Sequence, residues 1–499
     1  ACEQVLSSRA SLPGTLTLDS SSMGSILGML QGTRIADDTW IHGIEIDEDE
    51  TGIDVIVDIG TEELPGIPLD AVKENLAARL AARPDAVVRV RLDQPPIRHV
   101  VARVDDVPGL GWASYAPAPL PHPVTARLVE RPDDVDGAQG AAVLTNGVVS
   151  VVVDPTDGTF SIDGHGGLGR LVDGGDLGDS YNYSPPREDT LVDGPESVRV
   201  ELAEPGPVRA GAVITSKYRW PERADPNSSA RVGGALVTVT TKVELHAEEA
   251  TVRVTTSFQN PARDHRLRVH FPLPQPTASS TSGSAFGAVT RGLTAEGRSD
   301  ELGLPTFPAR DFVSAGGLTL AHRGVHEHEL IDIEPVGGTE VAKVLAMTLL
   351  RSTGMLSRVG MAYRPVPAGP LTAVEGLQLV GRRIETTYLL TLGDVDPWAL
   401  AEDATIALES VTSLGGGSRP ERGSALRVSG AQLSSVRRHE GLIEVRVYNP
   451  AVVETTVDLG DATGWLVDLR GRPTQAFKGA FTLRAFGIAT ARLVTAKTD

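Results

Sequence analysis

A long hairpin of alternating residues constrains the fold of this chain more than any other feature. In LVTVTTKVELHAEEATVRVTTSFQN, residues 236–260, apolar side chains alternate with polar ones along two successive segments. Successive side chains of a β-strand point to opposite faces, so each segment buries one face and exposes the other. Strands of this length are typical of a large two-sheet sandwich and not of a small barrel. We therefore predict a mainly β protein.

The same period-two pattern recurs through most of the chain and divides it into regions. Two stretches rich in proline or glycine, APAPLPHP and SLGGGSRPERGSA, mark boundaries between these regions. A strong hairpin signal, Asn146-Gly147, lies early in the β-rich part. We expect a remnant of a helical segment over 1–34, a small β-domain with one helix over 35–115, a linker over 116–140, a large β-sandwich over 141–412 and a terminal β-sandwich over 425–499.

The helix of the small β-domain departs most clearly from period two. In PLDAVKENLAARLAARPD, the apolar residues Val72, Leu76 and Leu80 recur every four positions. Asp70 is placed to cap the N-terminus, and Pro84 is placed to end the helix. We therefore predict one amphipathic helix on a small sheet. A second, short helix is expected nearer the start of the chain, in SSSMGSILGMLQG.

The charge balance excludes several classes of partner. The chain has 65 acidic and 46 basic residues, which give a formal charge of −19 at pH 7. Nucleic acid requires a basic footprint, and an anionic membrane surface repels a chain with this charge. No apolar run approaches the ~18 residues of a membrane-spanning helix. The single cysteine, Cys2, and the lack of a signal-peptide pattern lead us to expect a cytoplasmic protein.

Motifs that carry known chemistry are few. No zinc-finger spacing, H-E-x-x-H, P-loop or G-x-S-x-G is present. In GVHEHELID, His326 and His328 would share one face of a strand, as metal ligands can, but a solvated strand end is the simpler interpretation. In RDHRLRVHFPLP, we interpret the charged residues from Asp264 to Arg268 as an internal ion pair at the start of a strand, not as catalytic groups.

One loop combines acidic residues with two tyrosines. In DGGDLGDSYNYSPP, residues 173–186, the aspartates are three positions apart, and no glutamate stands where an EF-hand loop requires one. Acidic turn filler would explain the aspartates but not Tyr181 and Tyr183. A tyrosine offers a ring face and a hydroxyl, which suit the C–H faces and hydroxyl edges of a sugar. The chemistry alone leaves a turn, a calcium loop and a sugar site as alternatives.

A series of motifs extends this loop into a resemblance to a known family. The motifs are DGTFSI, GRLVDGGDLGDSYNYSPP, DHRLRVHFPLP, GLPTFPARDFVSAGGLTLAHRGVHEHELI, AMTLLRSTGMLSR and VRVYNP. In this order they resemble the C-terminal half of glycoside hydrolase family 38, the zinc-dependent α-mannosidases, in its bacterial form. The small domain that ends in VPGLGW is similar to the β-domain that follows the family's helical bundle, and ACEQVLSSRA looks like the tail of that bundle's last helix.

The resemblance implies a retaining glycosidase whose catalytic half is not in this chain. The family's zinc-binding His-x-Asp, its aspartate nucleophile and its general acid belong to an N-terminal α/β domain. No His-x-Asp followed by an aromatic residue occurs here. We therefore expect the C-terminal piece of an α-mannosidase that is inactive by itself. It would have no catalytic residue and no metal ligand, and zinc would be bound only in the intact enzyme.

The resemblance also places one wall of the mannose pocket in this chain. The family's pocket tyrosine falls on Tyr181, with Tyr183 at the aromatic position of the same loop and Asp179 beside it. A pocket arginine falls on Arg351 in TLLRS. We expect these four residues to bind substrate.

The expected partners follow from the resemblance and the charge. They are an α-mannoside or a mannose-containing glycan and the N-terminal catalytic half of the same enzyme. We expect neither a nucleic-acid nor a membrane partner, and self-association into a homo-oligomer stays open. Two rival functions remain: a stand-alone carbohydrate-binding β-sandwich without catalysis, and a calcium-stabilised adhesion module.

Overall fold

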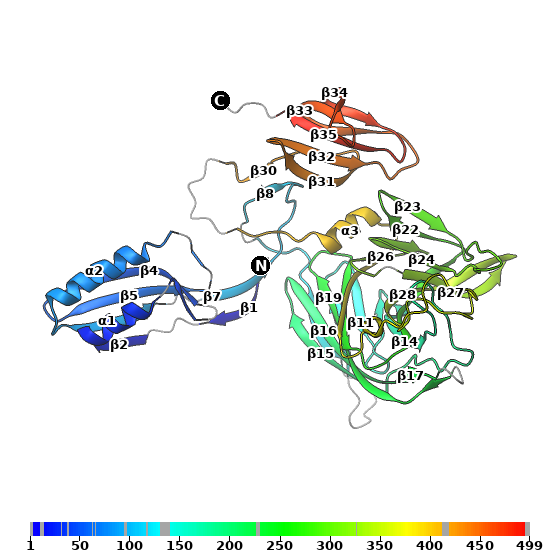
Figure 1. The fold of residues 1–499 in the computed structure, drawn as a ribbon, viewed down its shortest axis with the longest axis horizontal. Helices are drawn as coiled ribbons and strands as arrows, with labels where there is room; N and C mark the ends of the chain where they lie inside the picture. The colour runs from blue at the N-terminus through cyan, green and yellow to red at the C-terminus, as the bar shows by residue number, and fades with distance from the viewer. Residues whose placement is uncertain are drawn as a thin grey trace. The chain divides into compact units, whose positions relative to one another are not determined.

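The computed structural model is mainly β and divides into two compact units, one over Glu3–Ala102 and one that begins at Arg103 (Figure 1). The predicted fold class is confirmed. In the described residues, no helix has the length and apolar character needed to cross a membrane. The structure describes residues 3–9, 14–30, 32–36, 39–61, 63–64, 66–93, 97–115, 118–129, 140–225, 230–325, 327–411 and 419–494.

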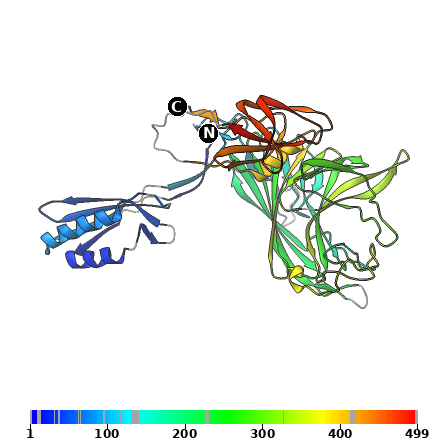
Figure 2. The ribbon, with the colours of Figure 1, turned by 45° about the horizontal axis from the view of Figure 1, so that its top comes forward.

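The smaller unit is a five-stranded sheet with two helices on one face (Figure 2). In sheet order its strands are β2 (Gly14–Asp19), β6 (Val87–Asp93), β5 (Ile53–Gly60), β4 (Thr39–Glu48) and β3 (Arg34–Ala36), and the helices are α1 (Ser20–Met29) and α2 (Leu69–Ala82). Strands β5 and β6 are parallel, since α2 crosses between them. Strands β1 (Glu3–Arg9) and β7 (Ile97–Ala102) form a separate pair.

The sequence predictions for this unit are confirmed in part. Both predicted helices are present, as α1 and α2, and Leu76 and Leu80 are buried as expected. Helix α2 begins at Leu69, so Asp70 lies in its first turn and is not its cap. The expected helical remnant over 1–34 is wrong for β1 and β2. The alternating segment GTLTLD pairs along its whole length with β6, and this pairing requires an extended backbone.

Two packed sheets form the core of the larger unit. The nine-stranded sheet has the order β15 (Ser197–Pro205), β16 (Arg209–Trp220), β19 (Ala235–His246), β20 (Val252–Gln259), β29 (Arg383–Leu392), β26 (Leu318–His322), β25 (Phe312–Ala315), β22 (Ser280–Ser284) and β23 (Gly287–Arg291). The five-stranded sheet has the order β14 (Arg170–Gly175), β21 (His265–Thr277), β28 (Thr339–Ser352), β27 (Glu327–Val336) and β24 (Thr306–Pro308). Phe271 of β21 meets Tyr388 of β29 edge-on in the shared core. The predicted hairpin is the central pair β19–β20.

A third sheet extends the same core and corrects the predicted linker. Its order is β13 (His165–Leu168), β12 (Phe160–Ile162), β11 (Ser150–Val153), β10 (Ala141–Thr145) and β9 (Thr125–Val129). Strand β9 lies inside the range 116–140 that was expected to be a linker, and it pairs with β10. Val124, just before β9, is fully buried in the core, so burial makes this stretch part of the sandwich. Residues 116, 117 and 130–139 of that range lie outside the described residues.

The C-terminal part has a five-stranded sheet with its own core, orange to red in Figures 1 and 2. Its order is β31 (Gln432–His439), β32 (Leu442–Tyr448), β35 (Ile488–Val494), β33 (Thr455–Val467) and β34 (Pro473–Leu483). The remaining elements are β8 (Gly111–Ala113) paired with β30 (Arg422–Ser424), β17 (Arg223–Ala224) paired with β18 (Arg231–Val232), the helix α3 (Pro397–Thr405) and a 3₁₀ turn over Glu375–Gln378.

Candidate functional site

The loop over residues 173–186, here called the acidic loop, begins in the last residues of β14. Its three aspartates Asp173, Asp176 and Asp179 are completely buried. A buried carboxylate is costly unless charged or hydrogen-bonding partners surround it. The partners of these three side chains therefore decide what the loop can do.

The carboxylate of Asp173 contacts the side chains of Arg231 and His265. One carboxylate oxygen accepts a hydrogen bond from the guanidinium of Arg231, which is itself buried. The other oxygen, Oδ1, lies 2.6 Å from Nδ1 of His265. The second ring nitrogen of His265, Nε2, lies 2.9 Å from Oδ1 of Asn260. These contacts join the start of the acidic loop to β18 and β21.

Asp176 folds the middle of the loop back on itself. Its Oδ1 accepts hydrogen bonds from the backbone N–H groups of Gly178 (2.8 Å) and Ser184 (3.2 Å). Its Oδ2 accepts a hydrogen bond from Nε of Arg351 at 2.8 Å. Burial tends to lower the pKa of Arg351, but the Asp176 carboxylate raises it above its usual value. Arg351 is therefore a charged anchor of the loop.

Asp179 makes the largest number of contacts. Its Oδ1 accepts from the backbone N–H groups of Tyr181 (2.9 Å) and Asn182 (3.0 Å), and its Oδ2 accepts from the N–H of Arg358 (2.7 Å) and the guanidinium of Arg364. Burial tends to raise the pKa of Asp179, but these hydrogen bonds lower it overall. The buried carboxylate presents no open face to a ligand, so its contacts support a structural role and not the expected contact with substrate.

A second segment, residues 352–369, contacts the acidic loop. The motif AMTLLRSTGMLSR includes its first part, but sequence reasoning did not place it against the loop. Ser180 donates from its backbone N–H to Met355 O (3.1 Å) and from its hydroxyl to Leu356 O (2.8 Å). The backbone N–H of Ala362 donates to the hydroxyl of Ser184 at 3.0 Å. Of the arginines in and beside this segment, Arg351 and Arg364 place their guanidinium groups on loop carboxylates, whereas Arg358 contributes its backbone N–H.

The two tyrosines of the loop differ in exposure. The Tyr181 side chain is 54% exposed. A Cβ atom added at Gly369 would lie 3.3 Å from the Tyr181 hydroxyl, so glycine lets the 352–369 segment approach the ring closely. Tyr183 is half-buried, and the guanidinium of Arg266 lies 3.6 Å above its ring. Burial raises the pKa of the Tyr183 hydroxyl. Tyr181 therefore offers the more open ring, whereas one face of Tyr183 is covered.

The other charged groups singled out in the sequence are structural. Arg268 pairs with Glu329 at 2.8 Å, and Asp264 accepts a hydrogen bond from Gln378 at 2.8 Å. His328 faces inward: its Nε2 lies 3.0 Å from the Ser280 hydroxyl, and burial with the nearby Arg291 lowers its pKa to about 4. The interpretation of His328 as part of a solvated strand end is therefore wrong. His326 and Cys2 lie outside the described residues.

A zinc ion finds no donor set among the described residues. In the ranges given above, no group of three His, Cys, Asp or Glu side chains is arranged to hold a metal ion. A zinc site needs three or four such ligands on one centre. The described residues thus do not fit a zinc site.

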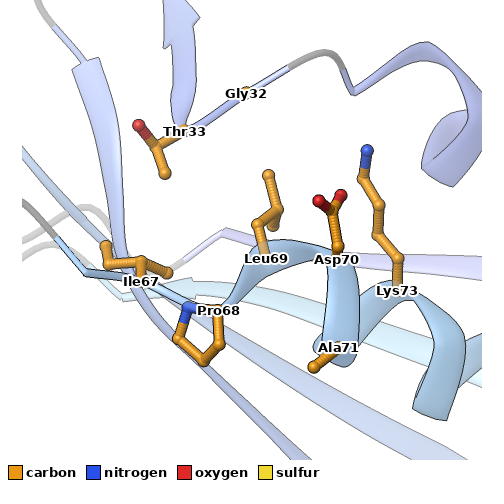
Figure 3. Close-up of a pocket in the computed structure, with 8 residues that line it drawn as sticks. All are labelled: Gly32, Thr33, Ile67, Pro68, Leu69, Asp70, Ala71 and Lys73. Atoms are coloured by element: carbon orange, nitrogen blue, oxygen red, sulfur yellow. The ribbon is translucent and has the colours of Figure 1, made fainter.

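Two cavities lie away from the acidic loop. One, of about 630 Å³, is at the N-terminal end of α2 and is lined in part by Thr33, Asp70 and Lys73 (Figure 3). The Lys73 ammonium donates a hydrogen bond to the carbonyl of Leu30. The other cavity, of about 510 Å³, is lined by residues of β19 and β20 and by Val380. Neither lining includes a residue of the acidic loop.

Comparison with known proteins supports the sequence resemblance. No family model matches the chain. A protein of Halalkalibacterium halodurans that carries the provisional name mannosylglycerate hydrolase is 25% identical over 271 residues, which are 49% of this chain and 29% of that protein. A solved glycosyl hydrolase family 38 protein from Enterococcus faecalis has a TM-score of 0.58 and 19% identity, over 76% of this chain and 53% of its own.

A solved alpha-mannosidase from Enterococcus faecalis V583 has a TM-score of 0.58 and 20% identity, over 76% of this chain and 51% of its own. The chain has the fold of glycoside hydrolase family 38 proteins. The resemblance to that family, first seen in its motifs, is confirmed at this level. The chain spans about half the length of both solved structures and less than a third of the length of the mannosylglycerate hydrolase relative.

Proposed function

We propose that this chain is the C-terminal β-sheet portion of an α-mannosidase that hydrolyses terminal α-D-mannosides with retention. In this proposal the acidic loop forms one wall of the sugar pocket. The nucleophile, the general acid and the zinc ion would belong to an N-terminal catalytic half. The relationship to family 38 proteins and the provisional name of the Halalkalibacterium relative support a mannoside as the substrate class.

The observation that carries the proposal is the pairing of an exposed ring with a rigid support. Tyr181 is 54% exposed, although the aspartates on its N-terminal side are completely buried. Its backbone N–H is tied to Asp179, and Asp179 is tied to the 352–369 segment. Binding sites depend on side chains whose position is set by surrounding contacts, because less ordering is then required when the ligand binds.

An activity measurement tests the division into two halves. The isolated chain should not hydrolyse an aryl α-mannoside above the level of a mock preparation. Mixing it with a recombinant N-terminal half of a family 38 enzyme should produce activity that a zinc chelator abolishes. Chelator-sensitive turnover by the isolated chain would contradict the proposal.

A binding measurement tests the pocket wall itself. Methyl α-mannoside should perturb the isolated chain in a titration followed by calorimetry or NMR, and Tyr181→Ala should abolish the response. Tyr115→Ala is the matched control, because Tyr115 is another exposed tyrosine of the same unit but lies outside the loop. Equal loss in both variants would contradict the assignment of Tyr181.

A stand-alone carbohydrate-binding protein is the second candidate. It is favoured by the open ring of Tyr181, which a sugar can reach without a second protein half. Tight binding of mannosides by the isolated chain, with no activity after mixing, would select this alternative.

A further inference from the structure

The imidazole of His265 lies between two hydrogen-bond acceptors in the core of the larger unit. Nδ1 faces Asp173 Oδ1 at 2.6 Å, and Nε2 faces Asn260 Oδ1 at 2.9 Å. The three side chains are completely buried. A neutral imidazole carries one N–H donor and one acceptor nitrogen, so it can satisfy only one of these two contacts. The identity of the two oxygens therefore determines the protonation state of the ring.

The orientation of the Asn260 amide is set by two backbone groups. Its Nδ2 donates to the carbonyl of Gln378 at 3.0 Å, and its Oδ1 accepts from the N–H of Ala262 at 3.1 Å. A flipped amide would place oxygen against the carbonyl and NH₂ against the N–H, which loses both bonds. The atom that faces Nε2 of His265 is therefore an acceptor, and Nε2 must carry a proton.

The carboxylate of Asp173 is ionised, because its other oxygen is bound by the guanidinium of Arg231. An ionised carboxylate only accepts hydrogen bonds, so Nδ1 of His265 must carry a proton as well. We propose that His265 is held as an imidazolium and that it positions the acidic loop through Asp173. The contribution to sugar binding rests on the proposed function, whereas the protonation state does not.

Besides its sequence neighbours Asp264 and Arg266, the ring has charged groups on the elements around it. On β14 and β18 the charged neighbours are Asp173 and Arg231, and Asp189 lies 3.8 Å from that arginine while accepting the N–H of Gly175 at 2.9 Å. On the remaining side the ring of Trp220 lies 5.7 Å from the imidazole. The backbone of His265 pairs with Gly175 and, on β28, with Ser352, an uncharged residue.

The protonation state of His265 affects the conformation of the acidic loop, because the ring bonds the first residue of that loop. Asp173 and Gly175 are the first and third residues of the acidic loop, and both are held by this cluster. Loss of one proton would leave a bare acceptor nitrogen facing an acceptor oxygen, which breaks one hydrogen bond and leaves buried polar atoms without a partner. The loop is therefore held at this end while the ring carries both protons, and deprotonation of the ring removes this support.

Nitrogen NMR of the ring tests the protonation state directly. The full chain, labelled with ¹⁵N-histidine, should show one histidine with both ring nitrogens protonated at neutral pH, and that signal should vanish in His265→Gln. His439→Gln is the matched control, because the side chain of His439, in the terminal sheet, is 44% exposed. A wild-type ring with one bare nitrogen at neutral pH overturns the proposal, even if His265→Gln does not fold.

A titration with methyl α-mannoside tests the positioning role. Its dissociation constant for the wild-type chain should rise about tenfold as the imidazolium signal is lost at higher pH, the size of one charge-assisted hydrogen bond. Binding that is unchanged while the ring loses its proton overturns the positioning role. A protonated ring in a chain that binds no mannoside contradicts the proposed function and supports the imidazolium assignment. The two failures are therefore distinguishable.

Discussion

The acidic loop and the start of β5 in the smaller unit, with the turn over residues 49–52 before it, use the same residue types in opposite ways. Arg89 of β6 contacts Asp54 of β5 through two hydrogen bonds of 2.6 and 2.7 Å, and in the turn Asp49 accepts from the N–H and hydroxyl of Thr51. The side chains of Asp54 and Arg89 are 39% and 30% exposed. In the loop, the carboxylates are completely buried.

The contribution of an ion pair to the free energy of unfolding therefore depends on its burial as well as on its geometry. Water screens the exposed pair, which can be lost at little cost. In the loop, removing one partner leaves a charge that water cannot reach. We therefore expect the loop to hold one conformation, whereas the turn tolerates substitution.

The largest expected effect is the loss of Asp179. Asp179→Ala would leave Nη2 of the buried Arg364 guanidinium and three backbone N–H groups without their acceptor. The free energy of unfolding should fall by about 3–5 kcal/mol, the usual cost of breaking a buried pair. Chemical denaturation followed by circular dichroism measures this loss.

The matched control is Asp54→Ala in the smaller unit, which removes the partner of Arg89. Its denaturation midpoint should not differ measurably from that of the wild type. If the two variants lose equal stability, the contrast between buried and exposed pairs is wrong.

The next effect is a loss of stability of the larger unit at low pH. Burial, with the nearby Arg268 and Arg266, lowers the pKa of His270 to about 3, and burial lowers that of His328 to about 4. A histidine of the unfolded chain has the usual pKa of 6.5, so below that pH the unfolded chain binds more protons at these two positions than the folded chain. Stability of the larger unit should therefore decline from about pH 6.5 downward.

The smaller unit should respond only in stronger acid. Hydrogen bonding by Arg89 lowers the pKa of Asp54 below the usual aspartate value of 3.8, so the stability it contributes is lost only as the pH falls below that value. Thermal unfolding across this pH range should show the larger unit weakening first. His270→Gln should reduce the slope, and an unchanged slope would show that another group controls it.

An intermediate effect is expected in the terminal sheet. Glu444 is buried between Arg492 and Arg437, but Arg437 is largely exposed. Glu444→Gln would remove the negative charge between the two arginines. The largely buried Arg492 would then be only partly satisfied, whereas Arg437 can turn to water. We expect a loss of about 1–3 kcal/mol in the free energy of unfolding, less than for Asp179→Ala. A loss of stability as large as that of Asp179→Ala would show that the exposure of Arg437 does not reduce the cost of removing the Glu444 charge.

The smallest effect is expected at the exposed end of the loop. Tyr181→Phe removes only the hydroxyl and should cost about 0.5–1.5 kcal/mol in mannoside binding, the worth of one neutral hydrogen bond. Tyr181→Ala also removes the ring face and should cost more. The thermal midpoint should barely change in either variant, because the ring is 54% exposed. A large fall in the midpoint with unchanged binding would make Tyr181 a packing residue.

Part of the site was predictable from the sequence. The motif around Tyr181 and Tyr183 identified the loop. Arg351 was predicted to bind substrate, and this stays a prediction. In the structure its guanidinium donates to Asp176 Oδ2 at 2.8 Å and to Asp179 O at 3.1 Å. The roles of Arg364 and Arg358 were not predictable. Arg364 and Asp179 are 185 residues apart in the chain, and no local pattern connects residues so distant.

The class of fold could be predicted from the sequence alone. Alternation in β19–β20 and the four-residue recurrence in α2 are local patterns, and a local pattern can be read from neighbouring residues. Which polar groups are buried could be learned only from the tertiary structure. Burial depends on strands brought together from distant parts of the chain, so it determines that Asp179 is enclosed while Tyr181, two residues later, stays open.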